Sequence, residues 1–378
     1  MTPAVKAPVG SLGAPAPRTV PSIAVSAYLL SRSATFITAA GIALISGRSI
    51  GGVLSLWDGG WYISIVRDGY PSFVLPGVGV ASQSSIAFFP GYPLLVRTLS
   101  EHLGISPVFA GCSVSLLAGL SATAALWHLA VRLSDEETAD KTVVLFAFLP
   151  SAFVMSMVYA DALFLVLAVC CLIALMDERW LTAGGTAAAA GLVRPTAVAL
   201  TIACAWAAIV AVRRTGRWRA MIAPAIAPAG ALLYLGYIWI HTGDAFAFFE
   251  VQNRGWGNRI DIGAANVRAV LRHFGERRST FFVAMIAIVV GGLGVGFWFL
   301  VCWRTPGFII AYVSIVIGLS FLGSNPMSIP RFLLAAFPLL IPIARRLSAR
   351  STLALAATCG ALMGTLFFVI GLSPTLSP

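Results

Sequence analysis

Charged side chains are scarce in this sequence: they make up only 10% of its 378 residues, while 59% are hydrophobic and the mean hydropathy is +0.91. Soluble globular domains average about 25% charged residues, so the composition excludes that class. The chain also lacks the period-2 alternation of transmembrane β-strands. Apolar runs of roughly 17 to 25 residues recur instead, each long enough to cross a hydrocarbon core of about 30 Å as a helix. These runs predict an all-α polytopic membrane protein.

The sequence has no pattern of metal-binding residues or of a disulfide framework. Its six cysteines all lie in apolar stretches, and no CxxC pair occurs among them. The four histidines are scattered, and neither HExxH nor DxD is present. We therefore expect no metal and no other cofactor.

The positive charge of the chain does not indicate a nucleic-acid partner. The formal net charge is +11, yet the arginines are dispersed among the loops and form no basic arm or domain. A nucleic-acid-binding protein usually gathers such residues on one face. The lipid bilayer is the partner that the composition predicts.

Three regions are predicted along the chain. Residues 1–21 are rich in Pro, Ala and Gly, a composition typical of a disordered tail, here a cytoplasmic one. The apolar stretch that follows is too long for the core of a signal peptide and lacks a clear cleavage site, so we expect it to remain as a membrane helix. Residues 22–371 are predicted to form a single transmembrane domain, and residues 372–378 a short tail.

About eleven membrane spans are predicted from the apolar runs and the charged or Pro-rich breaks between them. They lie near 22–46, 107–131, 142–159, 161–176, 181–193, 196–212, 220–240, 281–301, 306–322, 331–344 and 352–371. Two long loops, 47–106 and 241–280, interrupt the series. Several middle spans are short, so we expect them to be tilted, broken or sheltered by neighbouring protein.

The short arginine-rich loops predict the orientation. The loops around 213–219 and 345–350 hold clustered arginines, and the positive-inside rule assigns such short loops to the cytoplasm. Both long loops are then extracytoplasmic, and every polar cluster of chemical interest falls on their side of the membrane. These clusters are WDGGWY at 57–62, AFFPGYP at 87–93, YADALF at 159–164, VRP at 193–195, GDAFAFFEVQNRGWGNR at 243–259 and SIPRF at 328–332.

The second long loop contains a further periodic segment. Apolar residues recur with helical spacing over 267–274, while Arg268 and Arg272 take another face. This pattern indicates an amphipathic helix, either lying in the membrane interface or packed on other protein. In both cases it would help to roof a cavity at the lipid boundary.

Six motifs in order give the sequence a family resemblance. WDGGWYISIVRDGY, AFFPGYPLLVR, PSAFVMSMVYADALF, GLVRP, GDAFAFFEVQNRGWG and PRFLLAAFPLL follow one another over roughly residues 25–345. In this the chain resembles the PIG-V-type mannosyltransferases, relatives of the second mannosyltransferase of glycolipid-anchor synthesis, within the GT-C glycosyltransferase superfamily. The resemblance implies a GT-C-like fold of about 11 transmembrane helices, whose two long extracytoplasmic loops carry interfacial helices and form the active-site roof.

The resemblance also implies a reaction and a catalytic residue. The family's donor is polyprenyl- or dolichyl-phosphate mannose, used on the non-cytoplasmic face of the membrane. An acidic residue of the first outer loop, which maps onto Asp58, is the catalytic carboxylate. Two positions depart from the family pattern: Leu56 stands where Arg is frequent, and Asp161 stands where Glu is frequent. The first affects how Asp58 is paired, and the second keeps the charge on a shorter side chain.

The chemistry of a lipid-phosphate donor explains why one catalytic acid is enough. Phosphate is a leaving group of low basicity, so one carboxylate suffices to deprotonate the attacking hydroxyl, with inversion. Asp58 is our candidate for that base. The alternative is a purely structural role in an interfacial turn, in which Trp57 and Trp61 only anchor the chain. Asp68 is the second acid of the loop, either a structural partner of Arg67 or the base itself if the two roles are exchanged.

The remaining candidates would bind substrate. Arginine offers fixed multidentate donors for phosphate, so Arg194 and Arg331, each next to a proline at the end of an apolar span, are candidates; snorkelling to lipid headgroups is the alternative. An acid at 161 would bind sugar hydroxyls or pair with Arg194. The other predicted contacts are Trp57, Trp61, Tyr62, Asp68, Tyr159, Gln252 and Trp256.

Two other function classes stay open at this point, and so does the acceptor. A transporter or lipid flippase would share the hydrophobicity, although such proteins carry ionisable groups near mid-membrane and repeat-related halves. A structural or assembly subunit is the third possibility. If the chain is a glycosyltransferase, its acceptor is a glycolipid, a glycan or a protein hydroxyl, and the sequence does not distinguish them.

Overall fold

The computed structural model describes residues 22–258, 264, 268, 280–303, 305–322 and 329–373, with the backbone alone for 280–290 and for Leu322. The described residues form helices and connecting turns, and no strand occurs among them. The predicted tail 1–21, the periodic segment 267–274 apart from Arg268, and residues 374–378 lie outside the described residues.

Five helical segments are long and apolar enough to cross a membrane. They are α1 (Ser22–Ser46), α5 (Pro107–Leu133), the segment Pro195–Thr215 that ends in α9 (Val198–Thr215), the segment Trp218–Thr242, and α18 (Ala349–Leu372). A helix of 25 residues is about 37 Å long, which exceeds the hydrocarbon thickness of about 30 Å. The prediction of a multi-pass membrane protein is confirmed, whereas the count of about eleven transmembrane helices is not.

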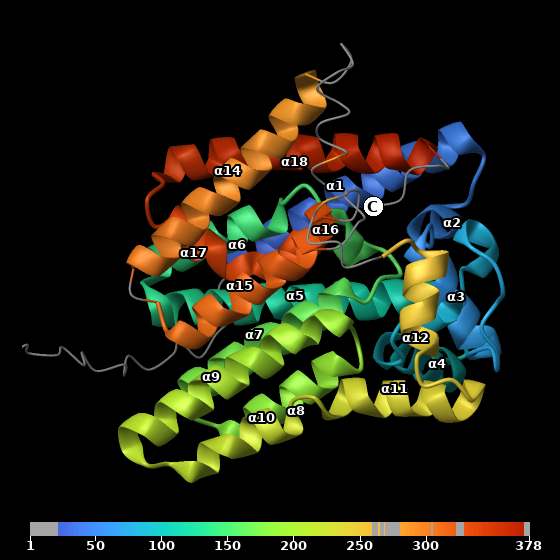
Figure 1. Ribbon diagram of the computed structural model, residues 1–378. Coiled ribbons are helices and arrows are strands. Elements are labelled where there is room, and N and C mark those ends of the chain that lie inside the picture. Colours follow the sequence, from blue (N-terminus) through green and yellow to red (C-terminus); the bar gives the residue numbers. More distant parts are fainter. Residues whose placement is uncertain are drawn as a thin grey trace, which may run out of the picture.

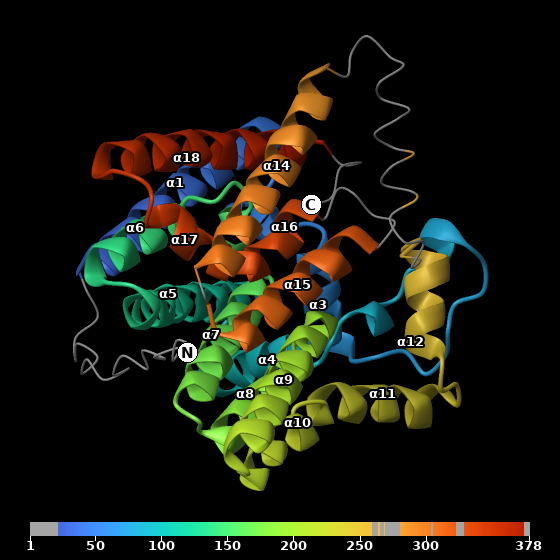
Figure 2. The ribbon, with the colours of Figure 1, turned by 60° about the vertical axis from the view of Figure 1, so that its left-hand side comes forward.

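Most predicted spans coincide with helices to within three residues at each end. Besides α1, α5, α9 and α18, these helices are α7 (Asp161–Met176), α8 (Trp180–Gly191), α14 (Thr280–Cys302) and α15 (Gly307–Leu322). The helices pack along one another, and α1 and α18 lie side by side in both Figure 1 and Figure 2.

The predicted span 142–159 is wrong. α6 (Glu136–Ala147) begins earlier, because the side chain of Asp135 caps it by accepting a hydrogen bond of 2.8 Å from the Thr138 backbone N–H. It also ends earlier, since Pro150 lacks an N–H and disfavours a helical residue before it. A short 3₁₀ turn, Ala152–Ser156, follows. The segment 148–160 is therefore buried but non-helical for most of its length.

Prolines also divide two other predicted spans. Span 220–240 is split at Pro228 into α10 (Ile222–Ile226) and α11 (Ala229–Thr242). Span 331–344 consists of α16 (Ile329–Phe332), a 3₁₀ stretch (Leu333–Leu339) that contains Pro338, and α17 (Leu340–Ala344). The apolar composition was detected correctly in both cases, but a proline inside the run changes the path of the backbone.

Both long loops contain helices. The first holds α2 (Ile50–Leu54), α3 (Asp58–Asp68), two 3₁₀ turns (Gly79–Ser82 and Ser85–Ala87) and α4 (Gly91–Leu103); the second holds α12 (Ala247–Glu250) and a π-helical turn (Val251–Gly255). Figure 1 shows α2, α3, α4 and α12 gathered at the right, far from the turn after α9 at the lower left. Their location at the membrane interface stays a prediction.

A buried arginine connects α1 to the non-helical segment 148–160. Arg32 is only 3% exposed, and its guanidinium donates hydrogen bonds to the carbonyls of Ala147 and Ala152 and, at 3.3 Å, to the Ser156 hydroxyl. Ala147 ends α6, where the helix dipole places partial negative charge. The cation of Arg32 therefore satisfies carbonyl groups that the irregular backbone leaves without helical partners.

We expect Arg32→Met to destabilise the protein, because it removes the donors of two buried carbonyls, each of which costs about 1–3 kcal/mol when left unsatisfied. The melting temperature of the purified protein in detergent would fall by several degrees. Arg97→Met is the matched control, since Arg97 pairs with Glu101 on the exposed surface of α4 and such pairs contribute little. Equal melting temperatures for the two variants would contradict this role of Arg32.

Candidate active site

The predicted site segments meet at one end of the helices. Asp58 follows α1 and α2, Asp161 begins α7, Arg194 precedes α9, and Arg331 lies in α16. The arginine-rich loops follow the far ends of α9 and of the helical segment Ile329–Ala344, at the opposite end of the bundle from these residues (Figure 1). The structure thus places the polar clusters together, and their extracytoplasmic location remains a prediction.

An ion pair joins Asp58 to Arg331 across 273 positions of sequence. The side chains are 18% and 8% exposed, so the pair is largely removed from solvent. Asp58 is the first residue of α3, where the partial positive charge of a helix N-terminus also favours a carboxylate. The first outer loop therefore supplies the acid, and the segment after α15 supplies its cation.

The backbone before Asp58 is strained. Trp57 has φ 55° and ψ −116°, a left-handed conformation that costs a non-glycine residue about 1–3 kcal/mol. Gly59 and Gly60, expected as turn residues in the alternative of a purely structural turn, are instead helical residues of α3. Gly59 is buried against the 148–160 segment, because a Cβ atom there would lie 3.4 Å from the Val158 carbonyl oxygen. The strained corner at Trp57 fixes where Asp58 begins its helix.

A second buried ion pair lies between Asp161 and Arg194, whose side chains are 5% and 13% exposed. Of the two roles predicted for Asp161, the structure therefore shows the pairing with Arg194. The guanidinium of Arg194 lies 5.4 Å from the ring centre of Phe332, and that of Arg331 lies 5.2 Å from the same ring. One aromatic ring thus contacts both arginines.

A small cavity opens between these groups. One part of its wall is polar and the other is apolar. The polar lining is Asp161, Arg194, Thr196 and Arg331, and the apolar lining is Phe164, Leu165, Phe332, Leu334 and Ala335. Two cations beside an apolar wall suit an amphiphilic anion such as a lipid phosphate.

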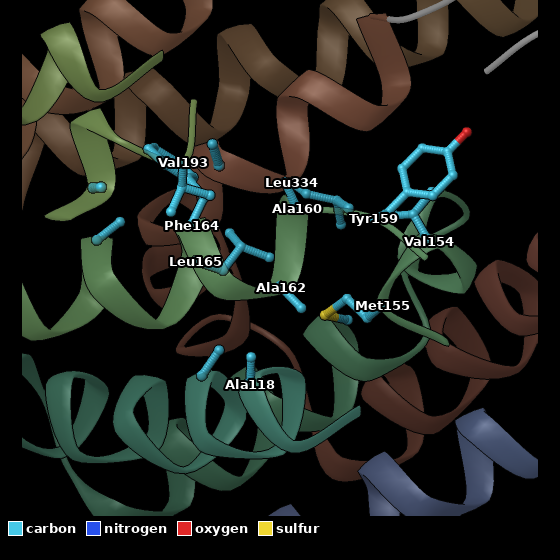
Figure 3. Close-up of a cluster of buried hydrophobic side chains, with 14 of the residues drawn as sticks. Ala118, Val154, Met155, Tyr159, Ala160, Ala162, Phe164, Leu165, Val193 and Leu334 are labelled. Carbon is cyan, nitrogen blue, oxygen red and sulfur yellow. The ribbon is translucent and has the colours of Figure 1, made fainter. Parts of the chain in front are cut away.

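Tyr159 lies next to these ion pairs, and the hydroxyl donor of its side chain is not used. Its side chain is fully buried, its ring centre lies 5.3 Å from the Arg331 guanidinium, and its hydroxyl donates no hydrogen bond. Figure 3 shows the hydroxyl directed away from the apolar side chains around it. Burial, and then the negative charge of Asp58, raise the pKa of Tyr159 well above its usual value, so the phenol keeps its proton. Arg331 Nε is likewise buried and unpartnered.

Side chains of distant segments hold the irregular stretch 86–88 in place. Its three consecutive carbonyls accept hydrogen bonds from Tyr234 Oη at 2.7 Å, Gln252 Nε2 at 3.2 Å and Tyr70 Oη at 2.7 Å, in that order. Asn258 Nδ2 also donates to Gln252 Oε1 at 2.8 Å. Gln252, predicted to contact sugar, thus has its amide engaged in joining the two outer loops, and sugar binding by it stays a prediction.

Three of the predicted aromatic residues form a cluster around Phe88. Trp61 stacks on Phe88 with centroids 6.1 Å apart, Tyr62 meets it edge-on at 5.3 Å, and Trp256 meets it edge-on at 5.5 Å. Trp61 and Tyr62 follow Asp58 by one turn of α3, so the cluster fixes the helix that carries the acid. The indole N–H of Trp256 is buried without a partner, which leaves it available to a ligand.

A glycine allows the FPGYP motif and the loop of Arg194 to approach each other closely. The Gly91 backbone N–H donates a 2.7 Å hydrogen bond to the Leu192 carbonyl, and a Cβ atom at Gly91 would lie 2.8 Å from the same oxygen. Only glycine allows this approach, which ties the FPGYP motif to the loop of Arg194. The motif therefore acts here through backbone proximity.

Asp68 is placed differently from Asp58. It is exposed at the last residue of α3, about 15 Å from the start of an 11-residue helix. No ion pair joins it to Arg67, and both residues are among those described. Between the two acids of the loop, the geometry favours Asp58 as the one beside the cations.

The sequence analysis missed six residues of the cavity lining, which are Phe164, Leu165, Thr196, Phe332, Leu334 and Ala335. Phe332, which contacts both arginines, directly follows Arg331, and Thr196 follows Arg194 by two positions. For these two residues the available signal was adjacency to an arginine and a proline in RPT and PRF. Within the described ranges, no three His, Cys, Asp or Glu side chains come close enough to hold a metal, and independence of a cofactor stays a prediction.

The family model for PIG-V mannosyltransferases matches residues 22–214, which is 193 of the 378 residues. The chain belongs to the PIG-V mannosyltransferase family. This confirms the resemblance read from the motifs, and with it the class of enzyme. The matched part of this PIG-V family protein contains Asp58, Asp161 and Arg194, while Arg331 lies beyond it.

A solved structure confirms the fold of this PIG-V family protein. The crystal structure of ArnT from Cupriavidus metallidurans bound to undecaprenyl phosphate, a GT-C glycosyltransferase, is similar with a TM-score of 0.56 and 14% sequence identity. The similarity covers 88% of this chain and 61% of that chain, so the protein spans about three fifths of the length of ArnT. A search of the curated proteins gives no match. At this identity the likeness shows the GT-C fold alone.

We expect Asp161→Ala to destabilise this PIG-V family protein by about 3–5 kcal/mol, because Arg194 would be left buried and unpaired. Chemical or thermal unfolding in detergent measures the loss. Glu101→Ala is the matched control, as its partner Arg97 is exposed and the pair is worth well under about 1 kcal/mol. If the two variants unfold alike, the Asp161–Arg194 pair does not hold α7 to the α8–α9 loop.

Proposed function

We propose that the protein transfers mannose from a polyprenyl-phosphate mannose donor to an acceptor hydroxyl, with inversion at the anomeric carbon. The observation that carries this proposal is the pairing of Asp58 with Arg331, which lines one cavity together with Arg194. An acid next to a partly apolar cavity that holds two fixed cations matches a reaction that needs one base and one phosphate site. Membership in a mannosyltransferase family supports the sugar.

The cavity lining supports a lipid-linked donor. Arg194 and Arg331 would hold the phosphate through charge-assisted hydrogen bonds. Phe164, Leu165 and Leu334 would face the first part of the prenyl chain, because apolar side chains remove it from water. ArnT was crystallised with undecaprenyl phosphate, which supports a polyprenyl carrier for a protein of the same fold.

Asp58 would act as the general base. The acceptor oxygen attacks the anomeric carbon from the face opposite the phosphate, and its proton passes to the Asp58 carboxylate. The bond between the anomeric carbon and the phosphate oxygen breaks, and polyprenyl phosphate leaves with the electron pair. Base assistance of this kind contributes about 10²- to 10⁴-fold in rate. A second carboxylate, as in glycosidases, is not required because phosphate needs little protonation.

The reaction would take place on the extracytoplasmic side of the cell membrane. The arginine-rich loops lie at the other end of the bundle from the site, and the positive-inside rule assigns that end to the cytoplasm. The acceptor is then an extracytoplasmic hydroxyl of a glycolipid, a glycan or a protein.

We expect Asp58→Asn to lower mannose transfer by at least about 10²-fold, because the amide cannot take the acceptor's proton. Membranes that contain the protein are given labelled polyprenyl-phosphate mannose and candidate acceptors, and the labelled product is counted. Glu101→Gln, an exposed acid on α4, is the control and should transfer normally. Loss of transfer in Asp68→Asn instead of Asp58→Asn would reverse the two assignments. Lipid translocation without transfer would favour a flippase.

We also expect transfer to continue when divalent metals are removed, since Arg194 and Arg331 supply the positive charge that the leaving phosphate needs. The measurement is the initial rate in membranes washed with EDTA, compared with the same membranes after Mg²⁺ or Mn²⁺ is added. Rates within about twofold of each other are expected. A loss of activity that added metal restores would show that the arginines do not suffice.

A further inference from the structure

Arg331 has two proposed partners, the carboxylate of Asp58 and the donor phosphate, which must lie apart during the reaction. In the structure its guanidinium is bound by Asp58, yet it also lines the cavity proposed for the donor phosphate. In an inverting transfer the base and the leaving phosphate lie on opposite faces of the anomeric carbon. The sugar then separates the two groups, so the pairing of Asp58 with Arg331 must end before the reaction begins.

We propose that the donor phosphate displaces Asp58 from Arg331, and that the released carboxylate is then held by the hydroxyl of Tyr159 in position to act as base. This inference rests on the proposed function and adds to it an order of events. The acid is sequestered until a lipid phosphate has bound, and no covalent bond changes in this step.

The exchange keeps the buried cation of Arg331 paired. Arg331 is 8% exposed, and a buried cation without a partner is strongly destabilising. A phosphate that replaces the carboxylate leaves Arg331 paired throughout. The Nε of Arg331 has no partner while Asp58 is bound, so the guanidinium has donor capacity left for the additional oxygens of a phosphate.

The released carboxylate also has a partner within reach. The Tyr159 hydroxyl is buried, carries its proton and has no acceptor, although nearly all buried polar groups in proteins have one. Its ring lies over the Arg331 guanidinium, which places the phenol beside the position that Asp58 leaves. Tyr159 is therefore a positioning residue, which acts on the acceptor only through Asp58.

The decisive measurement is the affinity for polyprenyl phosphate without sugar, in detergent or nanodiscs. In the wild type, part of the protein has Arg331 occupied by Asp58, and the apparent affinity falls with the fraction of binding-competent molecules. We expect Asp58→Asn and Asp58→Ala to bind this lipid at least about fivefold more tightly. Glu101→Gln removes an exposed acid of the same loop and should bind like the wild type.

Tyr159→Phe tests the second half of the proposal. It should bind polyprenyl phosphate within about twofold of the wild type and show an unchanged KM for the donor, while kcat falls about tenfold or more. A merely structural role would change KM and melting temperature together with kcat. Unchanged kcat in Tyr159→Phe overturns the assigned role of the hydroxyl.

Two outcomes separate this inference from the proposed function. If Asp58→Asn loses transfer but binds polyprenyl phosphate no more tightly than the wild type, the exchange is overturned and the function stands. If the wild type neither binds polyprenyl phosphate nor transfers mannose, both are overturned. Tighter binding by both Asp58 variants, together with the kcat effect of Tyr159→Phe, supports the exchange.

Discussion

Each of the two arginines of the site keeps a negative partner, and this constraint organises the whole site. Arg331 and Arg194 lie where little water reaches, and each is paired with an aspartate from a distant segment. These two pairs connect the first outer loop, the start of α7, the loop before α9 and the segment after α15. The arginines that hold these segments together can therefore also bind an anionic ligand, provided that the negative charge of the ligand replaces that of the aspartate it displaces.

The second constraint is that backbone groups near the membrane need partners. Non-helical backbone is tolerated there only where protein satisfies it, and the structure shows this twice. Arg32 donates to carbonyls around the 148–160 segment, while Tyr234, Gln252 and Tyr70 donate to three successive carbonyls at 86–88. Residues that resemble sugar-binding groups in sequence, such as Gln252, can therefore be engaged in holding the loops that form the site.

The apolar runs predicted most helices because hydrophobic length is a property of local sequence. Where proline interrupts a run, as at Pro150, length alone gave the wrong span. The choice of Asp58 and the two arginines came from motifs, but the pairing did not: Asp58 and Arg331 are 273 residues apart. Nothing local in either motif states which acid meets which cation, or that Phe332 lies against both arginines.

The strained corner at Trp57 links the buried Arg32 to the proposed chemistry. A left-handed tryptophan persists only where its surroundings fix it, and here the fixing groups come from the 148–160 segment. The Val158 N–H donates a 2.9 Å hydrogen bond to the Leu54 carbonyl, and Val158 also packs on Gly59. Since Arg32 holds that segment from within α1, a cation inside a membrane span sets the position of both Tyr159 and Asp58. Arg32 has no acidic partner in the first span. Its physical role is to fix the 148–160 segment and, through it, the position of the proposed base Asp58.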